Sequence, residues 1–183
     1  MQDNKRVEEI LNTLKKRQQE YKLNYYEPYP FQKRFHEAGL DTNQRLLMAA
    51  NRVGKSYVGA MEMAAHLTGL YPKWWKGRRF EEPIRAWVCG ASNETTRDIC
   101  QKELFGQPDN PRDKGKGSIP RHLIGETTRK PGVPNAHSSV LVKHNSGGWS
   151  RVAFKAYEQG AEKFMGESID LVWLDEEPPR EIY

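Results

Sequence analysis

The residues from Ala49 to Ser56 read AANRVGKS and carry the sharpest chemical signal in the chain. They match the phosphate-loop pattern G-x-x-x-x-G-K-[ST], with Ala49 in place of the first glycine. In such a loop, backbone N–H groups surround phosphate oxygens and the following helix adds its positive N-terminal end. Lys55 is expected to reach the β- and γ-phosphates, and the Ser56 hydroxyl to ligate Mg²⁺. The predicted nucleotide-binding residues of this segment are Ala50, Asn51, Arg52, Val53, Gly54, Lys55, Ser56 and Tyr57.

A second signal is the apolar run at 171–174, which ends in Asp175 and Glu176. A buried strand with this ending delivers carboxylates to the carboxyl edge of a sheet, where ligand sites of open α/β sheets lie. Asp175 is predicted to hold Mg²⁺, and Glu176 to polarise an attacking water. The alternative is a core strand followed by a solvated acidic turn.

Each signal is weak by itself, because Gly-Lys-Ser also occurs by chance in loops that join a strand to a helix. Together they are stronger, because the acidic pair follows the loop in the order that an ATPase site requires. Arg52 lies inside the loop, where a guanidinium stabilises charge on the γ-phosphate. We therefore predict Glu176, Lys55 and Arg52 as catalytic residues. An ion pair with a nearby acid, such as Glu176, is the alternative role of Arg52.

Upstream of the loop, Tyr29-Pro30-Phe31-Gln32 suggests how a base is bound. A glutamine amide can donate to and accept from an adenine edge at once, and an aromatic ring can stack on the base. Phe31 and Gln32 are therefore predicted to bind the adenine of ATP. A proline turn that opens a surface helix is the alternative.

Length and composition limit the classes of protein that fit. The 183 residues suffice for one domain, and the formal net charge of +5 permits a polyanionic partner without showing one. No apolar run approaches the roughly 20 residues of a membrane span, and the N-terminus lacks a signal-peptide core. We therefore expect a cytoplasmic chain that is not secreted and has no membrane partner. Cys89 and Cys100 are expected to be buried thiols, and no Cys/His cluster has zinc-ligand spacing.

Hydrophobic periodicity and helix-end signals predict an α/β fold, with a mostly parallel sheet flanked by helices. Residues 1–24 hold an amphipathic helix whose apolar stripe is expected to dock on the rest of the chain; binding a partner is the alternative. Residues 25–183 are expected to form the ATPase domain. Turn residues around Gly147 predict a hairpin, whereas 106–138 shows no clear long element. Further helices are expected at 32–38, 55–70 and 93–105, and strands at 45–50, 84–90, 140–143, 151–157 and 171–174.

Several phrases together resemble one family, the N-terminal ATPase of the large terminase subunits of tailed double-stranded DNA bacteriophages. They are NRVGKS, VWLDEE, YPKWWKGRRF, WVCGASNETTRDI and AYEQGAEKFMGES, and the resemblance covers about residues 29–179. It implies a RecA-like P-loop fold that uses ATP and Mg²⁺. It also implies translocation of double-stranded DNA into a procapsid through a portal protein. In this family the motor is a homo-oligomeric ring, assisted by a small terminase subunit, in the bacterial host cytoplasm.

The family also implies a C-terminal nuclease domain, which these residues do not include. The sequence stops about one helical turn after Pro178-Pro179, so we expect a chain truncated or split after its acidic strand, with an incomplete sheet. Two alternatives to a packaging motor stay open. One is another nucleic-acid-dependent motor, such as a helicase, and the other is a split or truncated fragment without enzymatic activity.

Overall fold

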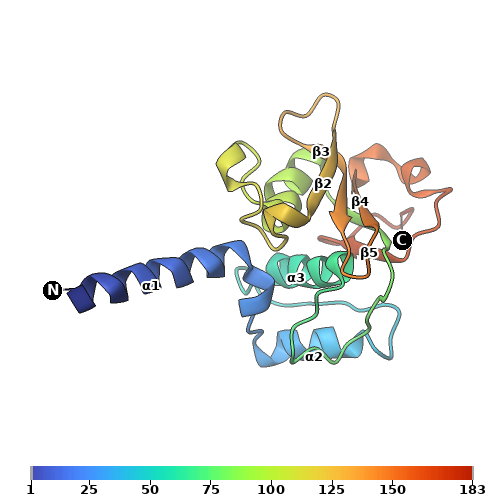
Figure 1. The fold of residues 1–183 in the computed structure, drawn as a ribbon. Helices are drawn as coiled ribbons and strands as arrows, with labels where there is room; N and C mark the ends of the chain where they lie inside the picture. Colours follow the sequence, from blue (N-terminus) through green and yellow to red (C-terminus); the bar gives the residue numbers. More distant parts are fainter. Residues whose placement is uncertain (1, 183) are drawn as a thin grey trace.

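A five-stranded sheet organises the chain in the computed structural model, which describes residues 2–182 (Figure 1). Its strands are β1 (Arg85–Gly90), β2 (Ile124–Arg129), β3 (His137–Lys143), β4 (Trp149–Ala156) and β5 (Leu171–Leu174). The order across the sheet is β2-β3-β4-β1-β5. β1 lies parallel to β4 and β5. The pairs β2–β3 and β3–β4 are antiparallel, and β3–β4 is the predicted hairpin. The α/β class is confirmed, but the sheet is mixed rather than mostly parallel, because the unpredicted β2 adds a second antiparallel pair.

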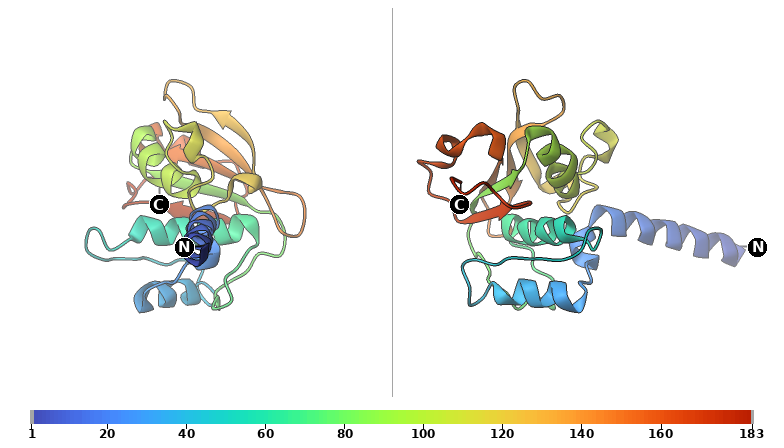
Figure 2. Two further views of the ribbon diagram at one scale, coloured as in Figure 1. Left: turned by 60° about the vertical axis from the view of Figure 1, so that its left-hand side comes forward. Right: turned by 180° about the vertical axis from the view of Figure 1, so that it is seen from behind.

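Helix α3 (Lys55–Thr68) lies between the sheet and a second helical layer (Figures 1 and 2). Its residues from 60 to 68 are all buried, because the helix packs against an apolar cluster on each of two sides. Met63 packs on the sheet side, and Met61 packs on the other side. Gly54 and Gly69 flank the helix with φ of 84° and 68°, a left-handed conformation that glycine adopts without strain. The predicted helix is therefore the central element of the fold.

Helix α2 (Pro30–Ala38) and the 3-10 turn η1 (Lys22–Tyr25) form the second layer. Pro30 occupies the first helical turn, where its missing N–H is tolerated. Aromatic rings hold the layer together: Trp75 is 4% exposed, and its ring centroid lies 5.0 Å from that of His36. This layer presents the predicted base-binding residues to α3.

The predicted helix at 93–105 forms in three pieces. They are α4 (Asn93–Thr95), the π-helical segment η2 (Thr96–Gln101) and α5 (Lys102–Phe105). The Ser92 hydroxyl caps the first piece by accepting from Thr95 N–H at 3.1 Å. The remaining 3-10 turns are η3 (Pro111–Asp113), η4 (Arg121–Leu123), η5 (Tyr157–Gln159) and η6 (Ala161–Phe164).

The predicted strand at 45–50 is wrong, because this segment has no regular structure. Leu46 and Met48 are each 81% exposed. The carbonyls of Ala49 and Ala50 accept hydrogen bonds from Lys55 Nζ, at 2.8 and 2.9 Å, rather than from a neighbouring strand. An apolar run signals burial but does not specify a partner strand. The phosphate loop is therefore reached by extended chain outside the sheet.

Strand β2 lies inside residues 106–138, where the sequence pattern predicts no long element. Its sequence, IGETTR, contains one large apolar residue, so the alternation that signals a strand is weak. β2 is an edge strand, and its inner neighbour β3 carries the buried residues Val140 and Val142. An edge strand that buries little apolar surface leaves little trace in a sequence.

Helix α1 (Gln2–Glu20) forms as predicted but does not dock on the rest of the chain. It projects away from the other elements in Figure 1 and in the right-hand view of Figure 2. Its apolar stripe is accordingly exposed, at 55% for Val7, 53% for Ile10, 50% for Leu11 and 44% for Leu14. The expectation of self-docking is wrong because the next apolar residues along the chain, beginning with Leu23, pack against α3 instead.

The two cysteines are buried free thiols, as predicted. Burial raises the pKa of Cys89 to about 12. Cys89 lies in β1 opposite Leu174, the last residue of β5. Over residues 2–182, no helix combines the length and apolar character needed to cross a membrane.

Candidate functional site

Ser56 and Asp175, the two predicted metal ligands, meet in the structure. Ser56 Oγ donates to Asp175 Oδ1 at 3.1 Å across a separation of 119 residues. Ser56 lies in the first turn of α3, and Asp175 directly follows β5. The Asp175 N–H donates to Cys89 O at 2.8 Å, so the carboxylate stays at the carboxyl edge that the parallel strands β1 and β5 share. The fold thus joins the phosphate loop to the acidic strand.

Gly59 permits this contact. A Cβ at this position would lie 2.5 Å from the Trp173 ring of β5. Gly59 and Ser56 are three residues apart and share one face of α3, so the helix approaches β5 closely where Ser56 must reach Asp175. Sequence patterns do not reveal this role, because a glycine inside a helix pattern signals only a weak helix position.

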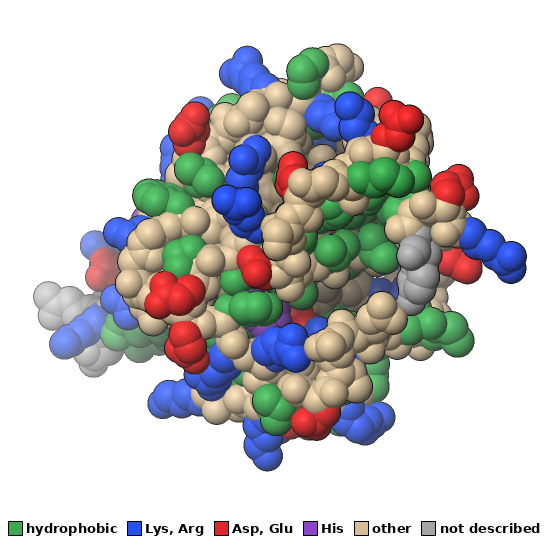
Figure 3. All heavy atoms as spheres, turned by 90° about the vertical axis from the view of Figure 1, so that its right-hand side faces the viewer, with side chains coloured by type: hydrophobic (Ala, Val, Ile, Leu, Met, Phe, Trp, Pro, Cys, Tyr) green, Lys and Arg blue, Asp and Glu red, His purple; other side chains and the backbone are tan. Residues whose placement is uncertain are grey.

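Strand β5 lies at the edge of the sheet, beside β1. Its Val172 is 44% exposed, and hydrophobic side chains reach the surface on this side of the molecule (Figure 3). A strand edge presents backbone groups without a partner strand. Within residues 2–182, the site therefore lies next to a strand edge that has no partner strand.

Asp175 is partly buried, and burial is the main reason that its pKa lies above the ordinary value of 3.8. The nearby charge of Glu176 also raises the pKa, whereas the Ser56 hydroxyl and the Lys55 ammonium lower it without cancelling the burial effect. No ion pair involves Asp175 in the described part of the chain. A site that disfavours its own anion gains from a cation that neutralises it.

The predicted catalytic residues Arg52 and Glu176 both have left-handed backbones, with φ of 63° and 65°. Among the described non-glycine residues, only Asn135 shares a positive φ. Such conformations are uncommon outside glycine and concentrate at functional sites. The Tyr157 hydroxyl donates to the carbonyls of Asp175 and Glu176, at 3.1 and 3.2 Å, and holds this turn. Tyr157 is a second site residue that the sequence does not reveal, because it follows an ordinary strand.

The side chains of Arg52 and Glu176 are exposed, and within residues 2–182 no ion pair joins them. Ala50 and Asn51 are exposed as well. Lys55 Nζ is bonded to the carbonyls at 49 and 50, so the loop is folded onto its own lysine. The lysine must exchange these carbonyls for phosphate oxygens if it is to bind a nucleotide.

Gln32 reaches the phosphate loop from α2. Its Nε2 donates to Val53 O at 3.4 Å, and a Cβ on Gly54 would lie 3.5 Å from the same nitrogen. Its Oε1 accepts from Tyr29 N–H at 2.9 Å, so this amide, 3% exposed, is engaged on both sides. Phe31 stacks on the Tyr29 ring, with centroids 6.3 Å apart. Gln32 thus touches the loop directly, whereas Phe31 pairs with a neighbouring ring.

Tyr57 is placed differently from the other predicted loop residues. Its ring packs edge-on against Tyr26, with centroids 5.6 Å apart, in the apolar layer beneath the loop. Burial is the main reason that its pKa is raised. Tyr57 therefore supports the loop from below and does not line its open side.

The donor set at Ser56 and Asp175 suits Mg²⁺. Hydroxyl and carboxylate oxygens are ligands that this ion accepts, and it usually retains waters and binds substrate phosphates through its other positions. Over residues 2–182, no group of three or more His, Cys, Asp or Glu side chains is arranged to hold a metal ion. A metal at this site therefore depends on phosphate oxygens for further ligands.

A separate cavity of about 760 Å³ lies at the opposite edge of the sheet, between the loops at 106–114 and 130–136. Lys114, Arg129 and Lys130 are among its lining residues, and no carboxylate lines it. It shares no residue with the contact between Ser56 and Asp175.

Comparison with known proteins gives relatives for most of the chain. Residues 46–183 match the family model described as "Terminase large subunit, T4likevirus-type, N-terminal". The chain is 40% identical over 178 residues to the large terminase subunit of Salmonella phage P22, a match that covers 88% of this chain and 36% of that protein. The chain thus spans little more than a third of the length of this relative.

A solved structure also resembles the fold. It is the large terminase ATPase domain of Thermus phage P74-26, with a TM-score of 0.51 and 16% sequence identity, over 84% of this chain and 55% of that one. At this identity, the likeness concerns the fold alone. The family model extends from the predicted phosphate loop through the acidic strand, and the phage P22 relative matches most of the sequence. The chain belongs to the terminase large-subunit family.

Proposed function

We propose that the chain binds ATP with Mg²⁺ and hydrolyses it as part of a motor that moves double-stranded viral DNA into a procapsid. The hydrogen bond from Ser56 Oγ to Asp175 Oδ1, at 3.1 Å, carries this proposal. It joins the two segments that together hold Mg²⁺ in P-loop nucleotide hydrolases. Membership of the terminase large-subunit family supports the packaging role.

The side chains of the site divide the work of phosphoryl transfer. Mg²⁺, when bound, supplies positive charge to the phosphates. Ser56 and Asp175 would hold the metal, and Lys55 would donate to the β- and γ-phosphates. Glu176 accepts a proton from the attacking water, and Arg52 stabilises charge on the γ-phosphate. In this scheme catalysis comes from positioning and charge neutralisation, without a covalent intermediate.

We further propose a RecA-like P-loop architecture in which Phe31 and Gln32 bind the adenine. The contact between Gln32 and Val53 supports this role, because it places the predicted base-binding residue next to the phosphate loop. The likeness to the ATPase domain of the Thermus phage terminase, at a TM-score of 0.51, supports the fold.

The partners follow from the packaging role and are proposed for the whole protein. They are double-stranded DNA, a portal protein, a small terminase subunit and further copies of the chain in a ring on the procapsid. This work takes place in the cytoplasm of the bacterial host. The match covers 36% of the phage P22 relative, so these partners are proposed for the whole protein and not for these 183 residues alone.

Binding of a non-hydrolysable ATP analogue tests the proposal. We expect AMP-PNP with Mg²⁺ to bind the chain in calorimetry, and Lys55→Ala to weaken binding about 10- to 100-fold, as expected for loss of a charge-assisted hydrogen bond. Far-UV circular dichroism of both proteins shows whether each is folded. A folded wild-type chain that does not bind AMP-PNP contradicts the proposed function.

A further inference from the structure

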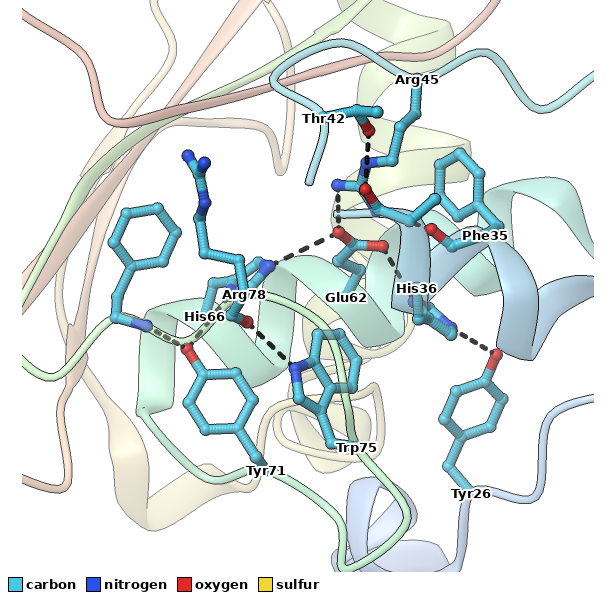
Figure 4. Close-up of polar contacts among 12 residues, drawn as sticks. Tyr26, Phe35, His36, Thr42, Arg45, Glu62, His66, Tyr71, Trp75 and Arg78 are labelled. Atoms are coloured by element: carbon cyan, nitrogen blue, oxygen red, sulfur yellow. Dashed lines mark hydrogen bonds and ion pairs between the residues drawn. The ribbon is translucent and has the colours of Figure 1, made fainter. Parts of the chain in front are cut away.

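The side chain of Glu62 extends from helix α3 toward His36, His66 and Arg45 (Figure 4). Glu62 is 6% exposed, and three side chains contact its carboxylate. His36 Nδ1 lies 2.8 Å from Oε2, His66 Nε2 lies 3.4 Å from Oε1, and the Arg45 guanidinium pairs with Oε1. Glutamate is rarely buried unless it is paired, and Glu62 meets this condition through three donors.

The outer ends of this cluster are also satisfied. The Tyr26 hydroxyl lies 3.1 Å from His36 Nε2, and the Tyr71 hydroxyl lies 3.0 Å from His66 Nδ1. Each histidine thus pairs with the carboxylate through one ring nitrogen and with a tyrosine hydroxyl through the other. The Arg45 guanidinium supplies a full positive charge beside the carboxylate.

Burial raises the pKa of Glu62, but hydrogen bonds from His36, His66 and Arg45 outweigh burial and hold the pKa below its ordinary value of 4.5. The carboxylate is therefore ionised at neutral pH. Because the residue is only 6% exposed, we expect it to influence a bound nucleotide through the groups that it holds.

Those groups belong to the segments that form the nucleotide site. His36 lies on α2, one turn after Gln32, and Arg45 begins the chain that leads into the phosphate loop. Arg45 also donates to Phe35 O at 2.8 Å, so it ties that chain to α2. Glu62 itself lies on α3, two turns after Lys55. The carboxylate of Glu62 thus connects α2, which carries Gln32, to α3, which carries Lys55, and to the chain between the two helices.

We propose that Glu62 is a positioning residue that holds the base-binding helix α2 in register with the phosphate-binding helix α3. This inference rests on the proposed nucleotide site. Between Gln32 and the loop there is one long hydrogen bond, 3.4 Å, which is too weak to fix a helix by itself. The hydrogen bond between His36 and Glu62, at 2.8 Å, is shorter and links α2 to α3 one turn after Gln32.

The proposal predicts that loss of Glu62 affects the base and the phosphates unequally. Lys55 and Ser56 belong to α3 and keep their places without the cluster, whereas Gln32 reaches the site only through α2. The affinity for AMP-PNP therefore falls more than the affinity for tripolyphosphate, which has no base. If Glu62 contributes only to general stability, its loss weakens the binding of AMP-PNP and of tripolyphosphate by the same factor.

Calorimetry with Mg²⁺ present tests this on wild type, Glu62→Gln and the control Glu126→Gln, an exposed carboxylate on β2. In Glu62→Gln we expect the ratio of AMP-PNP to tripolyphosphate affinity to fall about 3- to 10-fold, the value of one neutral hydrogen bond. The control keeps the wild-type ratio. An unchanged ratio in Glu62→Gln overturns the positioning role.

A pair of variants at His36 tests the same point if Glu62→Gln does not fold. His36→Asn keeps an N–H donor near the position of Nδ1, whereas His36→Leu removes it. We expect the affinity ratio to stay near wild type in His36→Asn and to fall in His36→Leu; equal ratios in both contradict the proposal. A folded wild-type chain that binds neither probe overturns the proposed function itself. Binding of both probes with ratios that no variant changes overturns only the positioning role.

Discussion

Glu62 lies on helix α3 and Asp175 contacts its first turn, and both carboxylates are at least partly buried. Glu62 receives three donors, and its pKa lies below the ordinary value despite burial. Asp175 receives one hydroxyl, and burial raises its pKa. The ionised form is thus stabilised by the fold at Glu62 and disfavoured by it at Asp175.

The difference separates a structural group from a binding group. A carboxylate whose donors are all supplied by the protein gains little from any ligand. A carboxylate with one donor, beside an exposed loop and an open strand edge, lacks positive charge that a ligand can supply. The fold therefore satisfies the carboxylate of Glu62 by itself, whereas the carboxylate of Asp175 has the unsatisfied charge that the proposed Mg²⁺ and nucleotide would neutralise.

The largest effect is expected at the open end of α3. Glu176→Gln should lower ATP hydrolysis by about 10²–10⁴, the usual contribution of a general base, while AMP-PNP binding stays near wild type. Steady-state phosphate release measures the first quantity and calorimetry the second. Unchanged turnover in this variant removes Glu176 from its proposed role.

Removal of the Glu62 carboxylate and removal of the Asp175 carboxylate should change the free energy of unfolding differently. Glu62→Leu leaves Arg45 and two histidines without their acceptor and should lower the free energy of unfolding by about 3–5 kcal/mol. Asp175→Asn should leave it unchanged or raise it, because the fold disfavours the Asp175 anion. Urea denaturation at neutral pH measures both. Equal destabilisation by the two variants contradicts the distinction.

Gly59→Ala tests how closely α3 must approach β5. A methyl group there meets the Trp173 ring, so we expect overpacking of about 1–3 kcal/mol and weaker Mg²⁺-dependent binding of AMP-PNP. Trp173→Leu in the same chain makes room and should restore part of both. If Gly59→Ala alone binds AMP-PNP as tightly as wild type, the close approach of α3 to β5 is not required for binding.

Acid should affect the two carboxylates in opposite directions. The lowered pKa of Glu62 contributes stability above its unfolded value of 4.5, and this contribution is lost as pH falls toward the folded pKa. The raised pKa of Asp175 contributes stability below its unfolded value of 3.8, and this contribution is lost as pH rises through the folded pKa. The stability of Asp175→Asn relative to wild type should therefore increase from acid to neutral pH. A relative stability that decreases over this range contradicts the assignment.

The smallest effect is expected outside both regions. Ile10 of α1 is 53% exposed, so Ile10→Gln should change the free energy of unfolding by no more than about 0.5 kcal/mol. Thermal or urea denaturation measures this change. A loss of several times that size would mean that α1 docks on the chain after all.

The parts of the site that the sequence predicts are those whose chemistry requires particular residue types. The predicted phosphate loop and acidic strand follow spacings that P-loop proteins need for phosphates and Mg²⁺, and in the structure Ser56 Oγ donates to Asp175 Oδ1. Helix α3 and strands β1 and β5 are also predicted, because each carries a run of mostly apolar residues.

The remaining features depend on pairings that no local pattern records. Strand β2 buries little apolar surface, and the apolar run at 45–50 has no partner strand in the described chain. Glu62 and His66 appear in the sequence as a polar pair one turn apart on a helix, a spacing typical of solvent-exposed faces. Their burial follows from His36 and Arg45, which only the tertiary fold brings to the same carboxylate.

The Mg²⁺ dependence of AMP-PNP affinity in wild type and in Asp175→Asn tests the central claim most directly. If Ser56 and Asp175 form the metal site, wild type binds AMP-PNP more tightly with Mg²⁺ than with a chelator, and Asp175→Asn loses most of that difference while it still binds the analogue without metal. An equal gain from Mg²⁺ in the two proteins would contradict this metal site and place the ion elsewhere.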